Sequence, residues 1–394
     1  MFGKTLGRLR QAVGVTAILV LSAASANPAA AQDAIVLGEP EAQSAEPFSH
    51  ISGLRPLSDG TLWVSDGLEG RLLRVSRDLS TSRAVGRTGA GPREYQTPDA
   101  LYAMAADTTL MMDIGNGRLA VLAPDGAIVR TFPMVSGEGP EMQMMIPGAV
   151  DDRGRVFFRP MGMMRGGIPD SVGIKVFDPG TDAVSDLAQV KLPEMNRTSS
   201  GGASNQRVMI RPVPLSREDV WTASPAGDLI VARSNDGVYW LERIDGSGTI
   251  RGPDISYRPV RIRNPDKDEW IASLSNRLSA MIDIDNGQRR TTFSRGGGRN
   301  AQSDPDDFVW PETKPAFPDG SLRVAPDGNI WLRRHAPAGQ APLYDVLDAS
   351  GRRLGSVRLP EGRTLEGLGE GDVYLSRTDD LDFVWLERYA MPIL

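Results

Sequence analysis

A short segment built around an Asp-Gly turn, or a close variant of one, occurs six times along this chain of 394 residues. Each copy places small and acidic turn residues before a run of strand-forming apolar residues. Clear copies are Ser58-Asp59-Gly60 before Leu62-Trp63-Val64, and Pro326-Asp327-Gly328 before Ile330-Trp331-Leu332. Asp-Gly supplies the positive φ that a tight hairpin turn requires, and aromatic and branched residues favour strands. The six copies lie around Leu62, Leu110, Val156, Leu229, Ile330 and Val373.

A second apolar strand follows each turn, and most copies then turn again through proline, aspartate, serine or glycine. This strand reads Arg71-Leu72-Leu73-Arg74-Val75 in the first copy and Leu343-Tyr344-Asp345-Val346-Leu347 in the fifth. A unit of strands joined by such turns is one blade of a β-propeller, and repetition along the chain is the signature of a ring of blades. The sequence therefore predicts an all-β, six-bladed β-propeller.

Two intervals between the copies are longer than the others, which predicts insertions. The fourth interval holds an insertion at 264–317, where Pro265-Asp266-Lys267-Asp268 opens a helical pattern that continues to Met281. A loop rich in glycine, arginine and aspartate follows from Gly296 to Asp307. The third interval holds a polar stretch from Arg197 to Arg207 that we expect to be a loop. The insertion between blades 4 and 5 is thus predicted to be partly helical.

The segment Ala34-Ile35-Val36-Leu37 precedes the first blade, whereas the last blade contains only three visible strands before Leu394. A propeller leaves no long exposed strand edge when its first and last segments share one blade. We therefore expect the segment around Ile35 to complete the last blade. The alternative is an unpaired terminus.

Residues 1–31 have the pattern of a secretory signal. Basic residues precede a short apolar run from Ala12 to Ala24, and Ala29-Ala30-Ala31 is a small-residue cleavage pattern. We expect cleavage after Ala31, which leaves a single propeller domain at 32–394 in the periplasm or secreted. The alternative is an uncleaved membrane anchor. No later apolar run is long enough to span a bilayer.

The charge of the chain bears on its partners. Loss of the signal takes the formal net charge from −6 to −9. An acidic chain without blocks of lysine and arginine is a poor candidate for nucleic-acid binding. The predicted partner is instead a protein, a glycan or a small anionic ligand.

The first two blades resemble a known group of propellers. The stretch Val85 to Pro98 reads VGRTGAGPREYQTP, and Met112 to Leu119 reads MDIGNGRL. These segments are similar to the glycine-rich segment and the D-x-x-N-x-R motif of NHL-type six-bladed propellers. The resemblance implies the fold and the number of blades. It implies no particular function, because such propellers include binding modules and unrelated enzymes.

A charged residue follows the second strand of each blade, where loops are expected to gather at one mouth of the channel. The predicted ligand-binding set is Asp66, Asp113, Arg159, Arg233, Arg334 and Arg377. Guanidinium groups pair with carboxylates and phosphates through two parallel hydrogen bonds, so a crescent of arginines suits an anionic ligand. The alternative is that these arginines form ion pairs within and between blades.

Two histidines and no cysteines limit the metal chemistry. A structural zinc site and a catalytic site of three histidines are both excluded. His50 and His335 remain candidate catalytic residues, as acid/base groups or as ligands of a divalent ion. The alternative is that both are surface residues. We predict no resident cofactor, with Ca²⁺ or Mg²⁺ as the alternative.

An oxygen-rich calcium site of the kind found in lactonase-type propellers is compatible with these residues. Asp66, Asp99 or Asp113 would supply its oxygen ligands. Those enzymes carry a Glu-Gly-Pro sequence where the first blade begins, and this chain has Pro47-Phe48-Ser49-His50 there. The resemblance therefore does not extend to lactonase activity.

Two classes of function follow. The first is a non-enzymatic exported propeller that binds a peptide, a glycan or a small anionic ligand at the channel mouth. The alternative is a hydrolase or lyase that uses a histidine of the funnel and a divalent ion. We favour the binding module.

Overall fold

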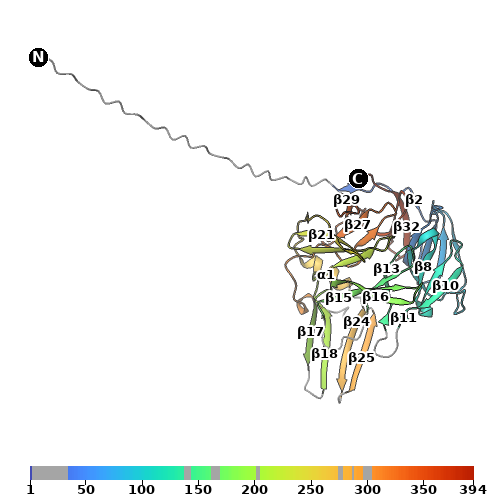
Figure 1. Ribbon diagram of the computed structural model, residues 1–394, viewed down its shortest axis with the longest axis horizontal. Coiled ribbons are helices and arrows are strands. Elements are labelled where there is room, and N and C mark those ends of the chain that lie inside the picture. The colour runs from blue at the N-terminus through green and yellow to red at the C-terminus, as the bar shows by residue number, and fades with distance from the viewer. Residues whose placement is uncertain are drawn as a thin grey trace. The chain divides into compact units, whose positions relative to one another are not determined.

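Six antiparallel β-sheets follow one another along the chain and form a ring, which confirms the predicted six-bladed β-propeller (Figure 1). This computed structural model describes Met1 and residues 34–136, 143–160, 169–200, 205–273, 278–285, 288–295 and 304–394. The signal-like residues 2–33 lie outside the described residues, as does most of the predicted loop at 296–303.

Each blade has four main strands, which we call A to D from the centre of the ring outward. Blade 1 comprises β3 (Ile51–Pro56), β4 (Leu62–Asp66), β5 (Arg71–Val75) and β6 (Ser82–Ala84). Blade 2 comprises β7 (Pro98–Ala103), β8 (Thr109–Asp113), β9 (Arg118–Leu122) and β10 (Ile128–Pro133). Blade 3 comprises β13 (Pro147–Val150), β14 (Val156–Phe158), β15 (Ser171–Asp178) and β16 (Ala183–Lys191).

The second half of the ring repeats this plan. Blade 4 comprises β19 (Val220–Ala223), β20 (Leu229–Asn235), β21 (Val238–Asp245) and β22 (Gly248–Arg251), and β23 (Ile255–Ser256) also pairs with β21. Blade 5 comprises β26 (Leu322–Val324), β27 (Ile330–Arg334), β28 (Leu343–Leu347) and β29 (Arg353–Arg358). Blade 6 comprises β30 (Arg363–Leu368), β31 (Asp372–Thr378), β32 (Val384–Ala390) and the N-terminal β2 (Ala42–Gln43).

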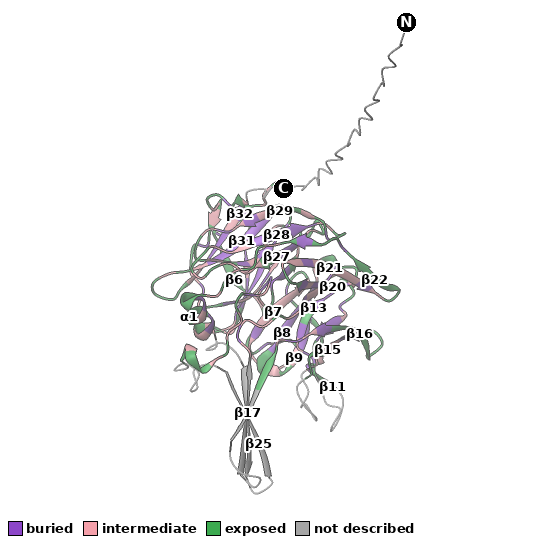
Figure 2. Cartoon of the chain, turned by 90° about the vertical axis from the view of Figure 1, so that its left-hand side faces the viewer, coloured by how far each residue is buried: buried purple, intermediate pink, exposed green. Residues whose placement is uncertain are grey.

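The hydrophobic core lies between neighbouring blades, and the B strands supply much of it (Figure 2). In β4, Leu62 and Val64 pack in the cluster shared with blade 6, whereas Trp63 packs in the cluster shared with blade 2. Successive side chains of a strand point to opposite faces, so one apolar strand serves two interfaces. This is why the strand after each turn is a continuous apolar run.

The N-terminal segment closes the ring, but with residues other than those predicted. Ala42–Gln43 (β2) pairs antiparallel with β32 and completes blade 6. Ile35–Val36 (β1) pairs parallel with β29 at the outer edge of blade 5. The prediction that the segment around Ile35 completes the last blade is therefore wrong by one blade. The closing strand is short and held by backbone hydrogen bonds, so it carries no apolar pattern in the sequence.

The insertion at 264–317 begins with α1 (Asn264–Ser273), as predicted, but the helix does not reach Met281. Residues beyond it form the hairpin of β24 (Leu278–Asp285) and β25 (Gln288–Arg295), followed by the short 3-10 helix η6 (Pro305–Asp307). The polar stretch predicted as a loop also forms a hairpin, of β17 (Met195–Ser200) and β18 (Asn205–Pro212).

The two inserted hairpins join in one sheet of order β17-β18-β24-β25. Elsewhere, β11 (Val135–Ser136) pairs with β12 (Gln143–Met144), and the 3-10 helices η1 (Ala105–Asp107) and η2 (Ile114–Asn116) lie in blade 2. In the part of the chain that the structure describes, no helix has the length and apolar character needed to cross a membrane.

Candidate functional site

The A strands of all six blades surround a central cavity of about 920 Å³. Its lining also includes the turns that join the A and B strands, among them Ser58-Asp59-Gly60, Asp107, Asp152, Pro225 and Glu370. We call this opening the A–B mouth. It lies at the end of the blades opposite to the loops between the B and C strands, where the sequence predicted the binding mouth. Its volume is in the range of small-molecule and peptide-side-chain sites.

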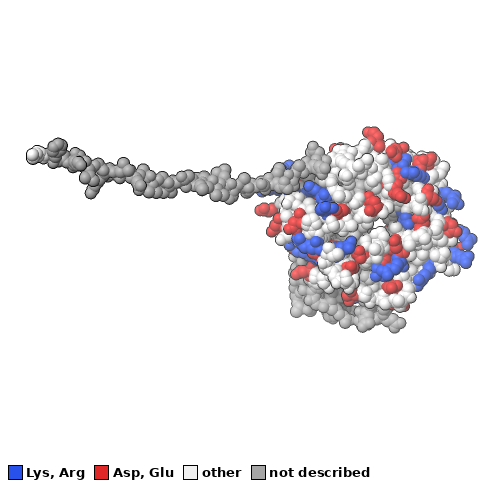
Figure 3. Space-filling view, turned by 45° about the horizontal axis from the view of Figure 1, so that its top comes forward, with Lys and Arg blue, Asp and Glu red and all other residues white. Residues whose placement is uncertain are grey.

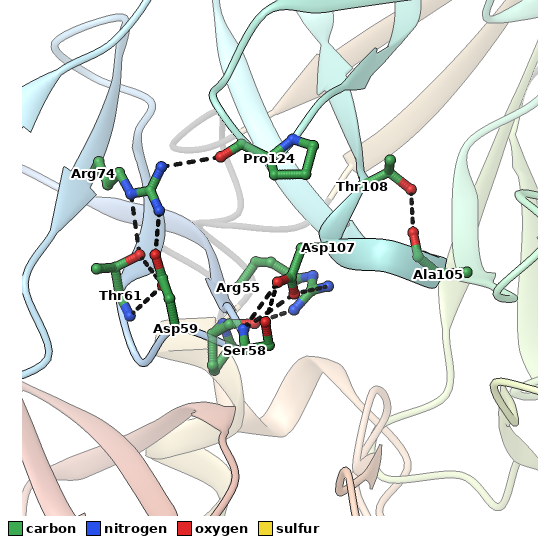
Figure 4. Close-up of polar contacts among 10 residues, drawn as sticks. Arg55, Ser58, Asp59, Thr61, Arg74, Ala105, Asp107, Thr108 and Pro124 are labelled. Atoms are coloured by element: carbon green, nitrogen blue, oxygen red, sulfur yellow. Dashed lines mark hydrogen bonds and ion pairs between the residues drawn. The ribbon is translucent and has the colours of Figure 1, made fainter.

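Arg55 lines the A–B mouth at the junction of blades 1 and 2. It projects from β3 toward Asp107 in the A–B turn of blade 2, at 3.6 Å (Figure 4). Its side chain is only 13% exposed, and it donates to the Pro56 carbonyl. Asp107 also accepts hydrogen bonds from the backbone N–H and the hydroxyl of Ser58. The two turns are thus locked together by a half-buried ion pair.

Burial shapes the electrostatics of this pair. The pKa of Arg55 is lowered from its usual value because desolvation outweighs the attraction of Asp107 and Asp152. Arg55 remains charged, since an arginine pKa lies far above neutral pH. Its Nε is buried and, among the described residues, has no hydrogen-bond partner. A buried donor without a partner is costly, so the burial of Arg55 offsets part of what its ion pair contributes to stability.

The turn that carries Asp107 has an uncommon backbone. Ala106 and Asp107 have φ of 54° and 56°, the left-handed region that L-residues other than glycine rarely adopt. Such strain persists where the surroundings enforce it, and it often accompanies binding sites. Here the Ser58 and Arg55 contacts hold the Asp107 carboxylate at the mouth.

Deeper in the channel, Glu366 projects from the A strand of blade 6. It accepts a hydrogen bond from the Ser376 hydroxyl. Burial raises the pKa of Glu366, against the opposing effects of that hydrogen bond and of the charges on Arg323 and His50. Arg323 comes from the A strand of blade 5 and donates to the Gly320 and Leu322 carbonyls. A carboxyl with a raised pKa beside a cation in a cavity is a feature of functional sites.

An aromatic side chain also lines the cavity. Trp221 from β19 leans over Gly148 of β13, where an added Cβ would lie 2.3 Å from the indole. Glycine at 148 is therefore required for the tryptophan to take this place between blades 3 and 4. The indole adds to the apolar part of the lining, which the A strands also supply.

The closing junction between blades 6 and 1 contributes a charged cluster to the mouth. Asp372 in blade 6 accepts hydrogen bonds from Arg77 of blade 1 at 3.1 Å and from Arg388 at 2.8 Å. Arg388 also pairs with Glu41, just before the closing strand β2, at 3.0 Å. These groups are tied to one another, so their main effect is to fasten the ring.

Acidic groups outnumber basic ones in the lining of the cavity. The acids are Asp59, Asp107, Asp152, Glu366, Glu370 and Asp372, and the bases are Arg55, Arg77 and Arg323. Arg55 and Arg77 are paired with Asp107 and Asp372, whereas Asp152 and Glu370 are exposed at the rim. The lining of the mouth is therefore net acidic. On the face of the molecule shown in Figure 3, acidic and basic side chains are interspersed.

Two of the predicted site residues, Asp66 and Asp113, are fully buried at the ends of β4 and β8. Asp66 accepts hydrogen bonds from the backbone of Ser49 and His50 and pairs with Arg71 at 3.1 Å. Asp113 accepts from Gln96, Thr97 and Asn116, and pairs with Arg118 at 3.0 Å. Each carboxylate thus holds, through hydrogen bonds, the segment that precedes the A strand of its own blade.

The predicted arginines of blades 4, 5 and 6 lie on B strands and form ion pairs with acids on the neighbouring C strands. Each acid lies two residues after the C-strand residue that faces the arginine. Arg334 pairs with Asp345 and Arg377 with Glu387, both at 3.3 Å. Arg233 pairs with Glu242 at 2.6 Å and also with Asp219. Blades 1 and 2 carry the acid on the B strand and the arginine on the C strand, and these three blades reverse that order.

Arg159 differs from the other predicted arginines. It follows β14 of blade 3 and is exposed. Five of the six predicted residues form ion pairs, and all six lie at the B–C end, so the set is separate from the cavity. Their role in ligand binding stays a prediction.

The two candidate histidines have different surroundings. His50 is exposed just before β3, and its electrostatic effect on Glu366 in the channel is to lower the pKa of that carboxyl. His335 follows β27, and burial together with the charges of Lys314 and Arg333 lowers its pKa to about 3. His335 is therefore neutral at physiological pH. Within the described ranges, no cluster of three or more His, Asp or Glu residues is arranged to hold a metal ion.

Comparisons with known proteins find only distant similarities. No family model and no curated protein matches the chain. A member of the DUF4221 family from Bacteroides vulgatus is 9% identical, with a TM-score of 0.43 over 90% of this chain and 98% of that one.

Two enzymes of known structure are similarly distant. A gluconolactonase from Xanthomonas campestris is 11% identical, with a TM-score of 0.37 over 90% of this chain and 98% of that one. Virginiamycin B lyase from Staphylococcus aureus is 10% identical, with a TM-score of 0.35 over 87% and 96%. At this level of similarity none of their activities is assigned to the chain.

Proposed function

We propose that this protein is an exported binding propeller that takes a peptide segment with a basic residue at the A–B mouth of its central channel. The observation that carries the proposal is the cavity of about 920 Å³ whose rim holds the exposed carboxylates Asp152 and Glu370. Carboxylates at a concave mouth attract cationic groups and orient them through charge-assisted hydrogen bonds.

The interior of the cavity supports a peptide over a free cation. Trp221 and the apolar A-strand residues provide contact area, whereas Arg323 and Glu366 offer both a donor and an acceptor deeper in the channel. A peptide presents all of these features together: a basic side chain, carbonyl acceptors and N–H donors. Pockets that combine an apolar wall with a few convergent polar groups are typical of binding sites.

A small anionic ligand at the B–C end is less well supported. That expectation depended on a crescent of arginines, and three of them are paired with Glu242, Asp345 and Glu387. Binding an anion there would require breaking ion pairs that are partly buried.

Export is part of the proposal because residues 1–31 have the pattern of a secretory signal. Cleavage after Ala31 would place the propeller in the periplasm or outside the cell. N-terminal sequencing of the protein recovered from the periplasm and medium tests this, and an N-terminus at Met1 would contradict it.

Peptide binding is tested by calorimetric titration of the mature protein with three matched synthetic hexapeptides, in which the central residue is Arg, Gln or Glu. We expect the Arg peptide to bind best. The double variant Asp152→Asn, Glu370→Gln should weaken its binding about threefold to tenfold, because each exposed charge pair contributes up to about 1 kcal/mol.

Asp380→Asn is the matched control, since Asp380 is an exposed carboxylate in the loop between β31 and β32 at the opposite end. It should leave the affinity unchanged. Equal binding of the three peptides, or an equal effect of the control, would refute the proposal. Tighter binding of a polyanion such as inositol hexakisphosphate, lost in Arg377→Ala, would favour the B–C end instead.

A further inference from the structure

A second cavity of about 280 Å³ lies between blades 4 and 5. Aliphatic side chains form its walls, and small turn residues such as Ala226, Gly328 and Ala349 form its rim. The walls are Ile230, Leu241, Ile250, Val324 and Ile330. Ile250 is 57% exposed, so the cavity opens to solvent beside an apolar surface residue.

The cavity exists because blade 4 has a smaller residue where most other blades have an aromatic one. The B-strand residue that packs toward the next blade is Ile230 in blade 4. The corresponding residues are aromatic in four blades: Trp63, Phe157, Trp331 and Tyr374. The shorter isoleucine leaves the space that a ring would occupy.

Backbone contact closes the outer wall of the same cavity. Gly252 after β22 and Gly351 in the turn of blade 5 touch, and a Cβ on Gly252 would lie 2.9 Å from the Ser350 carbonyl. Glycine at 252 is therefore needed for the two blades to meet there. This part of the wall consists of backbone in close contact, which favours a preformed pocket over a packing gap that collapses.

The two cavities are adjacent and share part of a wall. Pro225, in the A–B turn of blade 4, and Val324, at the end of β26, line both of them. A ligand chain at the A–B mouth therefore lies beside the aliphatic cavity, with only these two residues between them. The lining also includes three charged residues, and all three are paired: Arg243 with Asp228 at 3.5 Å, and Glu242 with Arg233 at 2.6 Å.

We propose that this cavity is a specificity pocket for one large aliphatic side chain of the peptide bound at the A–B mouth. This inference rests on the proposed function and adds a second recognition element to it. The shared wall places the pocket beside a peptide bound at the A–B mouth. The aliphatic lining suits an apolar side chain, and the volume accommodates one of leucine size. The ligand class is a peptide with a basic residue and an aliphatic residue a few positions apart.

The test uses peptides that contain one Arg and either Leu or Ala at one, two or three positions from it. The wild-type protein should prefer Leu over Ala about tenfold at one spacing, as expected when an aliphatic side chain is buried. Ile230→Phe fills the cavity from within, and Ala349→Leu blocks it from the rim. Both variants should abolish the preference and leave the affinity for the Ala peptide unchanged.

Thr181→Leu is the control for Ala349→Leu, because Thr181 is an exposed residue in the equivalent outer turn of blade 3. It should retain the preference. Equal binding of Leu and Ala peptides at every spacing would overturn the specificity pocket and leave the proposed peptide binding intact.

A second measurement does not depend on peptides. Isobutanol carries the branched end of a leucine side chain, and its titration should shift the methyl NMR signals of Ile230 and Ile330. Ile230→Phe should remove the effect at Ile330. Absence of these shifts in the wild-type protein would overturn the pocket even if no peptide binds, whereas failure of all peptides would refute the proposed function separately.

Discussion

His335 links the stability of the fold to pH. Its pKa in the folded protein is lowered to about 3 by burial and by Lys314 and Arg333, with Asp266 opposing them. An unfolded histidine titrates near its ordinary value of about 6.5. The unfolded chain therefore binds a proton more readily below that pH. As far as His335 is concerned, the free energy of unfolding is therefore highest above about pH 6.5 and decreases as the pH falls toward 3.

We expect His335→Gln to remove the part of the pH dependence that His335 causes. That part is a decrease of about 1.4 kcal/mol in the free energy of unfolding for each pH unit between about 6.5 and 3. Urea unfolding at pH 7, 6, 5 and 4 gives the free energy of unfolding of each protein. His50→Gln, at the exposed histidine, is the control and should retain the slope of the wild type. If all three proteins lose stability in parallel, His335 is not responsible.

The residues of the candidate site could not be read from the sequence, for a physical reason. Strand alternation tells which side chains face a channel only if the register is regular. The A strands of blades 1, 2, 3 and 6 contain register shifts, for example between Ile51 and Gly53 and between Leu365 and Gly367. A bulge changes the facing of the residues after it, so Arg55 and Glu366 carried no recognisable signal. The charged ends of the B strands were visible because they repeat.

At the scale of the element, the A–B turn of blade 2 contains strain that a glycine would relieve. Ala106 has φ of 54°, a conformation that costs an L-residue about 1–2 kcal/mol. Ala106→Gly should raise the free energy of unfolding by about 0.5–1 kcal/mol, because the freer unfolded chain offsets part of the gain. Asp107 is one of the acids that make the mouth net acidic, so a less firmly held carboxylate there should also weaken binding of the Arg peptide.

Asp182→Gly separates the two effects. Asp182 has φ of 57° in the exposed outer turn of blade 3 and is not part of the lining of the A–B mouth. It should yield a smaller gain in stability and no change in peptide affinity. Unfolding curves and titration of both variants provide the comparison. An unchanged affinity in Ala106→Gly would show that the turn does not position Asp107 for binding.

The inserted elements illustrate how distant pairing overrides a local pattern. Leu278 and Met281 continue the apolar spacing of α1, so the sequence favoured one longer helix. In the structure both lie in β24, where Met281 pairs with Met209 of β18, a strand from the preceding interval. Local periodicity contains no information about such a partner. The start of α1 was predictable because its first turn carries proline and aspartate.

At the scale of the whole molecule, the number of blades was predictable because six turn-and-strand copies repeat. The closing strand was not, because β2 is held by backbone bonds and by polar residues. Ser44 is 5% exposed; its N–H donates to the Leu386 carbonyl at 2.8 Å, and its hydroxyl accepts from the Leu386 N–H at 3.1 Å. A short polar segment with this role resembles an ordinary loop in the sequence.

The ring should therefore depend more on β2 than on β1. Ser44→Pro removes both contacts with Leu386 and should lower the free energy of unfolding by about 2–3 kcal/mol. Val36→Pro, in the exposed outer strand β1, should cost less than about 1 kcal/mol. Ser44→Pro should also leave the edge of β32 exposed, and light scattering should detect association through that edge. Urea unfolding followed by tryptophan fluorescence compares the two variants, and equal losses would mean that β2 does not close the ring in preference to β1.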